Sequence, residues 1–149
     1  MQKAGFIGLG AMGAPMAKRI LSAGFDLSVF DVRPENADPL VELGAKRAGS
    51  LREAAEGAEA LVLMVVNAEQ IEDALFGGDG AAETLSPESA VVVMSTVGPE
   101  AVRRIGGRFW CRACFRENGQ TGPNRRFSSN LAHLHDARST KLGLCSDGS

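Results

Sequence analysis

Residues 4–13 read Ala-Gly-Phe-Ile-Gly-Leu-Gly-Ala-Met-Gly, an apolar run that passes into three glycines spaced GxGxxG. The run Ala4–Gly8 has the composition of a short buried strand. After it, apolar side chains recur every three to four positions up to Leu21, a period typical of a helix with one buried face. Gly24 follows, where a helix commonly ends. A glycine-rich turn between a strand and a helix indicates the start of a βαβ unit.

Strand and helix patterns alternate along the next 80 or so residues. Apolar runs predict further strands at 27–31, 60–66 and 90–94. Helices are predicted at 34–43, 51–56, 68–76 and 99–105. Ser50 and Glu53 have the spacing of a capping box at the start of the second of these helices. This alternation predicts an α/β fold, a Rossmann-type doubly wound parallel sheet.

The three glycines have separate roles in such a turn. Gly8 permits the tight turn, Gly10 lets the backbone approach a pyrophosphate, and Gly13 lets the helix pack closely on the strand. The helix N-terminus offers N–H groups and its positive dipole end to phosphates. The motif predicts a dinucleotide site whose loop contacts come from Gly8, Leu9, Gly10, Ala11, Met12 and Gly13. The alternative is a glycine-rich turn without a ligand.

An acidic residue at the end of the second strand completes this pattern. Asp31 lies 18 residues after Gly13, near the usual spacing of about 20. Its carboxylate can accept hydrogen bonds from ribose hydroxyls and would repel a 2′-phosphate, which favours NAD over NADP. Arg33 favours NADP instead, because a guanidinium can pair with that phosphate. The structural alternative for Asp31 is capping of the turn before Pro34.

Two further loops follow strands whose carboxyl ends should meet at the same crevice. Val66 and Asn67 lie at the end of the 60–66 run, and Thr96 follows the 90–94 run. The Asn67 and Thr96 side chains can hydrogen-bond a ribose or a nicotinamide. The alternative for both is N-capping of the next helix, and the two roles can coexist.

Segment 6–16, Phe-Ile-Gly-Leu-Gly-Ala-Met-Gly-Ala-Pro-Met, resembles the opening of the β-hydroxyacid dehydrogenase family, which is related to 6-phosphogluconate dehydrogenase. Segments 65–70, 76–80 and 94–100 are similar to further family landmarks, in family order. The resemblance covers residues 3–106. It implies a 3-hydroxyisobutyrate dehydrogenase-like or L-threonate dehydrogenase-like oxidoreductase, with the glycine loop, Asp31, Asn67 and Thr96 at the cofactor.

The family's substrate loop, Asp-Ala-Pro-Val-Ser-Gly-Gly, is expected next, followed by a catalytic lysine and an all-helical domain. Residues after 106 match none of these, and the Ser-Thr-Lys-Leu-Gly segment around Lys141 is unlike the lysine motif. We therefore expect no catalytic residue in this chain. The chain should bind cofactor but turn over little substrate. The small hydroxy acid is expected as a partner only of a full-length relative. An imine or ketol reductase that shares the glycine loop is the alternative family, and segment 95–99 favours the β-hydroxyacid dehydrogenases over it.

Composition changes abruptly after residue 108. Residues 1–108 carry 10 Lys/Arg and 15 Asp/Glu, whereas residues 109–149 carry 6 and 3, and hold all the Cys and His. We assign 1–108 to an NAD(P)-binding domain and predict an irregular C-terminal tail at 109–149, as an out-of-frame reading of a GC-rich gene would produce. The alternative is a non-enzymatic interaction or metal-binding protein that uses Cys111, Cys114, His133 and His135. The His-x-His spacing suits zinc poorly, so no metal site is predicted.

The remaining expectations concern partners and location. A net charge of −2 argues against a nucleic-acid surface. No apolar run approaches the ~20 residues of a membrane helix, and no signal peptide precedes the first strand, so we expect a cytoplasmic protein. A sheet that ended at 90–94 would expose its edge, which predicts self-association. Phe109, Trp110 and Phe115 are expected to cover part of that surface.

Overall fold

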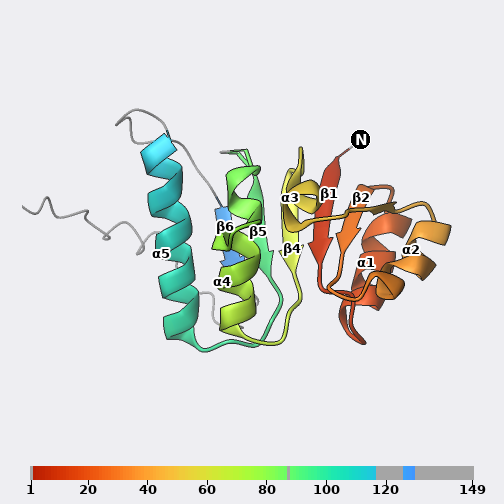
Figure 1. The fold of residues 1–149 in the computed structure, drawn as a ribbon, viewed down its shortest axis with the longest axis horizontal. Helices are drawn as coiled ribbons and strands as arrows, with labels where there is room; N and C mark the ends of the chain where they lie inside the picture. The colour runs from red at the N-terminus through yellow and green to blue at the C-terminus, as the bar shows by residue number, and fades with distance from the viewer. Residues whose placement is uncertain (1, 87, 117–125, 130–149) are drawn as a thin grey trace, which may run out of the picture.

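The computed structural model of the protein describes residues 2–86, 88–116 and 126–129. Within these residues, six parallel strands form one sheet in the order β3-β2-β1-β4-β5-β6. The strands are β1 (Lys3–Ile7), β2 (Asp26–Phe30), β3 (Lys46–Arg47), β4 (Ala60–Leu63), β5 (Ala90–Val93) and β6 (Arg126–Ser129). The chain winds outward from β1 through β2 to β3. It then crosses back to run from β4 to β6 on the other side of β1 (Figure 1). This confirms the predicted Rossmann-type fold, in which a crevice opens where the strand order reverses, at the carboxyl ends of β1 and β4.

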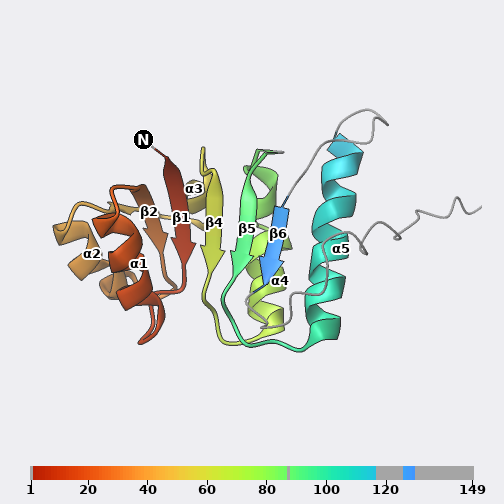
Figure 2. The same cartoon turned by 180° about the vertical axis from the view of Figure 1, so that it is seen from behind.

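Helices cover both faces of the sheet. They are α1 (Gly13–Ser22), α2 (Asp38–Glu42), α3 (Leu51–Ala55), α4 (Ala68–Phe76) and α5 (Pro99–Arg116), with 3₁₀ turns η1 (Pro34–Ala37) and η2 (Ala81–Glu83). α1 and α2 pack on one face, and α3, α4 and α5 on the other (Figures 1 and 2). Neighbouring residues of β1 enter opposite cores, Phe6 on the α1 side and Ile7 on the α4 side. Both faces of the sheet are therefore apolar, which explains the unbroken apolar runs in the sequence. No helix in the described part of the chain is long and apolar enough to span a bilayer.

The helix predicted over 34–43 is interrupted. The chain forms η1 and then α2, and at the junction the N–H of Asp38 donates to the carbonyl of Glu35. Pro39 has no N–H, so it cannot donate to Glu35 as a continuous α-helix requires. The two-residue strand β3 follows, and it is too short to leave a pattern in the sequence.

Helix α5 is longer than the sequence predicts. It was expected to end at Ile105, before Gly106 and Gly107, but it continues to Arg116. Phe109 is buried in the core cluster that includes Ile71 and Leu75 of α4, which holds α5 in place beyond the two glycines. This confirms that Phe109 covers apolar surface, whereas the structure describes only the backbone of Trp110 and Phe115. Tertiary packing thus outweighs the low helix propensity of the two glycines.

Ion pairs add to this packing between α4 and α5. The carboxylate of Glu72 on α4 pairs with Arg104 at 2.6 Å and with Arg108 at 3.2 Å. The Arg108 guanidinium also lies 4.7 Å from the centre of the Phe76 ring, a cation–π distance. These contacts join α4 to the part of α5 that precedes the predicted domain boundary at 108.

A strand also lies where the sequence predicts irregular structure. β6 pairs in parallel with β5, with Phe127 opposite Val91. The unpaired backbone groups on the edge of β5 give any extended segment a template for pairing. The prediction of an irregular tail is therefore wrong for residues 109–116 and for β6. The β5 edge that was expected to be exposed and to promote self-association is covered by β6.

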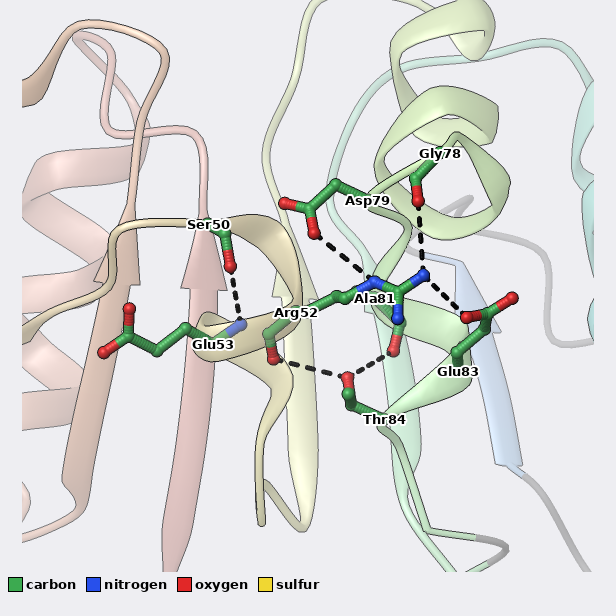
Figure 3. Close-up of polar contacts among 8 residues, drawn as sticks. All are labelled: Ser50, Arg52, Glu53, Gly78, Asp79, Ala81, Glu83 and Thr84. Atoms are coloured by element: carbon green, nitrogen blue, oxygen red, sulfur yellow. Dashed lines mark hydrogen bonds and ion pairs between the residues drawn. The ribbon is translucent and has the colours of Figure 1, made fainter.

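A polar cluster ties α3 to the loop after α4 (Figure 3). The Arg52 guanidinium donates to Glu83 at 2.7 Å and to the carbonyl of Gly78 at 3.2 Å, and its Nε lies 3.3 Å from an oxygen of Asp79. The Thr84 hydroxyl donates to the Arg52 carbonyl at 3.3 Å. This cluster fixes the glycine-rich loop at the end of α4, and it lies at the opposite end of α4 from the crevice.

The capping box predicted at Ser50 is present at the start of α3 (Figure 3). The Ser50 hydroxyl accepts a hydrogen bond from the N–H of Glu53 at 3.1 Å. The Glu53 carboxylate in turn accepts from the N–H of Gly49 at 2.7 Å, one residue earlier than in the standard box. Two N–H groups at the entrance of the helix are thus satisfied by side chains.

Candidate cofactor-binding crevice

Gly8 forms the turn between β1 and the glycine loop, in a conformation that only glycine adopts readily. Its φ is +95°, and a Cβ atom at this position would lie 2.1 Å from the carbonyl oxygen of Met64. Its N–H donates to the carbonyl of Phe30 at 3.0 Å. The turn after β1 is therefore packed between the loops that follow β2 and β4, and a side chain cannot be accommodated.

Gly13 and Gly10 differ in what surrounds them. A Cβ atom at Gly13 would lie 1.9 Å from the carbonyl oxygen of Gly8, so α1 is packed directly against the turn. A Cβ atom at Gly10 would meet no atom within 4 Å. The protein's own packing thus requires glycine at Gly8 and Gly13, whereas at Gly10 the missing side chain leaves open space beside the backbone. This is the pattern expected where a ligand approaches the main chain.

Backbone donors surround that open space. The N–H of Ala14 donates to the carbonyl of Gly10 at 3.1 Å and closes the first turn before α1. Among the hydrogen bonds of the described residues, none is donated by the N–H groups of Gly10, Ala11 or Met12. These groups precede a ten-residue helix, whose dipole favours an anion at this end. The loop therefore fits a phosphate group.

The Asp31 carboxylate connects the glycine loop to the turn after β2. Its Oδ2 accepts a hydrogen bond from the N–H of Leu9 at 2.6 Å. Its Oδ1 accepts from the N–H of Arg33 at 2.8 Å and from the Asn36 side-chain amide at 3.1 Å. The capping role weighed for Asp31 is thus present, and it places the carboxylate directly beside the glycine loop. The Arg33 side chain is exposed.

Asn67 caps α4, as its alternative interpretation predicted. Its side-chain oxygen accepts from the N–H of Gln70 at 2.9 Å, and the Gln70 side chain accepts from the N–H of Val66 at 2.8 Å. Thr96 does not cap α5, since the N–H of Val102 donates to the carbonyl of Gly98, two residues further on. Both Asn67 and Thr96 are exposed at the crevice end of the sheet.

Ser95 is a part of the site that sequence reasoning missed. Its side chain is buried, and its hydroxyl accepts a hydrogen bond from the N–H of Val65 at 2.9 Å. This bond joins the loop after β4 to the loop after β5. The only signal in the sequence is a serine that directly follows an apolar strand. Ser95 thus sets the spacing of two crevice loops.

Exposed apolar side chains gather at the same end of the sheet. Of the described residues, four large apolar ones are exposed, and three lie on crevice loops: Met12 at 65%, Val32 at 87% and Val66 at 81%. Met12 lies on the loop before α1, which begins only at Gly13. Exposed apolar groups beside convergent polar groups are typical of a site for a partly apolar ligand. Val32 was not singled out in the sequence, because exposure at a strand end has no periodic pattern.

The other predicted site residues contribute backbone or lie outside this region. The Leu9 side chain is buried on the α1 side, so only its backbone faces the crevice, while Ala11 is exposed on the loop. Within the residues that the structure describes, no group of three or more His, Cys, Asp or Glu could hold a metal ion. The alternative metal site is not tested, because the structure describes only the backbone of Cys111 and Cys114, and His133 and His135 lie outside the described residues.

Known proteins resemble the chain over this same region. A family model described as the NAD binding domain of 6-phosphogluconate dehydrogenase matches residues 3–110. An NAD-dependent L-serine dehydrogenase of Pseudomonas aeruginosa is 38% identical over 119 residues, which make up 80% of this chain and 38% of that protein. The chain thus spans about two-fifths of the length of this relative.

Solved structures give the same result. The crystal structure of 3-hydroxyisobutyrate dehydrogenase from Salmonella typhimurium has a TM-score of 0.70 at 37% identity, over 74% of this chain and 39% of that one. An imine reductase from Pseudomonas sp. is also similar, with a TM-score of 0.61 at 28% identity over 72% of this chain and 36% of that one. With the family model covering the glycine loop and every strand from β1 to β5, this chain belongs to the family of NAD(P)-binding domains of 6-phosphogluconate and β-hydroxyacid dehydrogenases.

Proposed function

We propose that the crevice binds NAD(H) in preference to NADP(H). The observation that carries this proposal is the position of the Asp31 carboxylate, hydrogen-bonded to the N–H of Leu9 at 2.6 Å. A carboxylate beside the phosphate loop can accept ribose hydroxyls, and it repels a 2′-phosphate. The exposed Arg33 guanidinium opposes this preference, but the Asp31 carboxylate is bonded to the loop through the N–H of Leu9 and is held in place by two further hydrogen bonds from the turn after β2.

Each part of the dinucleotide has a matching set of residues. The N–H groups of Gly10, Ala11 and Met12 suit the pyrophosphate. Val32 and Val66 offer apolar surface to the flat rings, and Asn67 and Thr96 lie on loops that follow β4 and β5, towards the nicotinamide side. Asn67 uses its side-chain oxygen to cap α4, so its amide N–H₂ is the part left for a ligand. When bound, NAD supplies a ring carbon that accepts or donates hydride.

In the whole protein we propose hydride exchange with a small β-hydroxy acid. The relatives named for L-serine and 3-hydroxyisobutyrate support this substrate class. The described residues contribute cofactor binding and orientation, and the chemistry at the hydroxyl needs a proton donor and acceptor. An imine reductase has a similar fold, so the fold alone does not distinguish a hydroxyl substrate from an imine substrate.

The substitution Asp31→Asn tests the cofactor preference. It keeps an acceptor for the Leu9 N–H but removes the charge that repels a 2′-phosphate. We expect the Kd for NADH to rise about tenfold, the value of one charged hydrogen bond, and the Kd for NADPH to stay level or fall. Fluorescence titration of both cofactors measures this. Asp26→Asn, the same change at the exposed opposite end of β2, is the matched control. Tighter binding of NADPH than NADH by the unmodified chain would contradict the preference.

We also propose that the tail after residue 108 is read out of frame. The support is the change in composition, with every Cys, His and Trp after residue 108. Sequencing the gene across codons 100–149 and translating all three frames tests this. We expect another frame to restore a segment like Asp-Ala-Pro-Val-Ser-Gly-Gly. If no frame contains it, the tail is a genuine product, and stoichiometric zinc lost on replacing Cys111 and Cys114 would favour the metal-binding alternative.

A further inference from the structure

The turn after β2 holds the Asp31 carboxylate from the side away from the glycine loop. Asn36 lies in η1, half-buried, and its side-chain amide donates to Asp31 Oδ1 at 3.1 Å. Its backbone N–H donates to the carbonyl of Arg33 at 3.0 Å, which closes the turn. The turn therefore fixes the backbone of Asn36, and the side-chain amide of Asn36 is bonded to the Asp31 carboxylate.

The distribution of donors over the two carboxylate oxygens is uneven. Oδ1 accepts two hydrogen bonds, from the N–H of Arg33 and the amide of Asn36, whereas Oδ2 accepts one, from the N–H of Leu9. Each carboxylate oxygen has about two lone-pair sites. The unused capacity therefore lies on Oδ2, the oxygen that faces the glycine loop. Asn36 is the donor that fills Oδ1 and keeps the carboxylate in this orientation.

The turn that carries Asn36 is itself braced from β3. The Arg47 guanidinium donates to the carbonyl of Pro34 at 2.9 Å and pairs with the carboxylate of Asp38. Pro34 begins η1 and Asp38 follows its end, so one side chain holds both ends of the four-residue turn. Arg47 has no contact with Asp31 among these bonds, and its effect on the carboxylate must pass through the turn.

We propose that Asn36 and Arg47 are positioning residues that orient the Asp31 carboxylate towards the adenosine ribose and so determine the discrimination between NAD and NADP. The proposal rests on the proposed function of the crevice and deepens it. An oriented Oδ2 accepts a ribose hydroxyl and leaves the carboxylate charge facing the 2′ position. A carboxylate that can rotate loses the first interaction and weakens the repulsion of a 2′-phosphate.

The test compares cofactor affinities of the full chain and its variants by fluorescence titration with NADH and NADPH. We expect Asn36→Ala to raise the Kd for NADH about fivefold, while the Kd for NADPH changes less than about twofold. Arg47→Gln should shift the ratio of the two affinities in the same direction, by about twofold. Glu35→Ala alters an exposed side chain of the same turn and should leave both affinities unchanged. Circular dichroism and a thermal melt confirm that each variant is folded.

The ratio of the two affinities separates orientation from a merely structural role. Loss of the turn's stability would weaken the binding of NADH and NADPH equally. An equal rise of both Kd values in Asn36→Ala and in Arg47→Gln would therefore overturn the proposal. Unchanged affinities in both variants would overturn it as well. If the unmodified chain binds NADH but the two variants do not change the ratio of the affinities, the positioning proposal fails and the proposed function of the crevice stands. If the unmodified chain binds neither dinucleotide, both proposals fail.

Discussion

Replacing Gly8 by alanine is expected to lower the free energy of unfolding by about 3–5 kcal/mol, because two costs combine. A side chain at a φ of +95° is strained, and its Cβ would lie 2.1 Å from the carbonyl oxygen of Met64. That carbonyl cannot easily move away, since the N–H of Met64 donates to the carbonyl of Ile7 at 2.9 Å and joins β4 to β1. Urea denaturation followed by circular dichroism measures the change.

Gly24→Ala is the matched control for the backbone strain. Gly24 also has a positive φ, +91°, but a Cβ there would meet no atom within 4 Å. We expect this variant to lose only about 1 kcal/mol. The difference between the two variants isolates the contact with the loop after β4. Equal losses would mean that this contact is absent in solution and that the turn is packed differently.

Replacing Gly10 by alanine is expected to have the opposite effects, with the free energy of unfolding unchanged and the binding of cofactor weakened. A Cβ at Gly10 meets no protein atom within 4 Å, so the fold accepts it. The added methyl would occupy the space in which a pyrophosphate reaches the N–H groups of the loop. Loss of one hydrogen bond to a charged group corresponds to a rise in the Kd for NADH of about 10- to 100-fold. Titration calorimetry with NADH and a thermal melt measure the two quantities.

Gly78→Ala provides the control for Gly10. Gly78 also has open space around its Cα, and it lies in the loop at the far end of α4. We expect neither its stability nor its affinity for NADH to change. If Gly10→Ala binds NADH as tightly as the unmodified chain, phosphates do not approach this loop, and the crevice must be assigned to another ligand.

The elements that position the crevice were predictable because their signals are local. The glycine spacing and the apolar runs at 60–66 and 90–94 each report on a few consecutive residues, and the structure confirms the doubly wound parallel sheet that they imply. The end of α5 was not predictable, because Gly106 and Gly107 favour a helix end while the buried Phe109, which depends on the tertiary fold, extends it. β6 depends in the same way on the free edge of β5.

The same distinction between local signals and tertiary contacts applies to the candidate site. The positions of Asp31 and the three glycines follow from spacing, and the geometry gives each glycine a distinct environment. The partners of these residues do not follow from spacing. The hydrogen bond from the N–H of Leu9 to Asp31 spans 22 residues, and that from the N–H of Val65 to Ser95 spans 30. Only the folded sheet brings such pairs together, so the sequence could indicate which residues bind but not what holds them.

These two bonds have a consequence for the entropy of binding. Together with the bond from the N–H of Gly8 to the carbonyl of Phe30, they join the loop after β1 to the loop after β2, and the loop after β4 to the loop after β5. None of these bonds needs a ligand. A dinucleotide that enters the crevice then has few backbone dihedrals left to immobilise, and less of its interaction energy is spent on ordering the protein. The crevice is in this sense preorganised, and its affinity depends chiefly on the fit of the cofactor rather than on a conformational change of the loops.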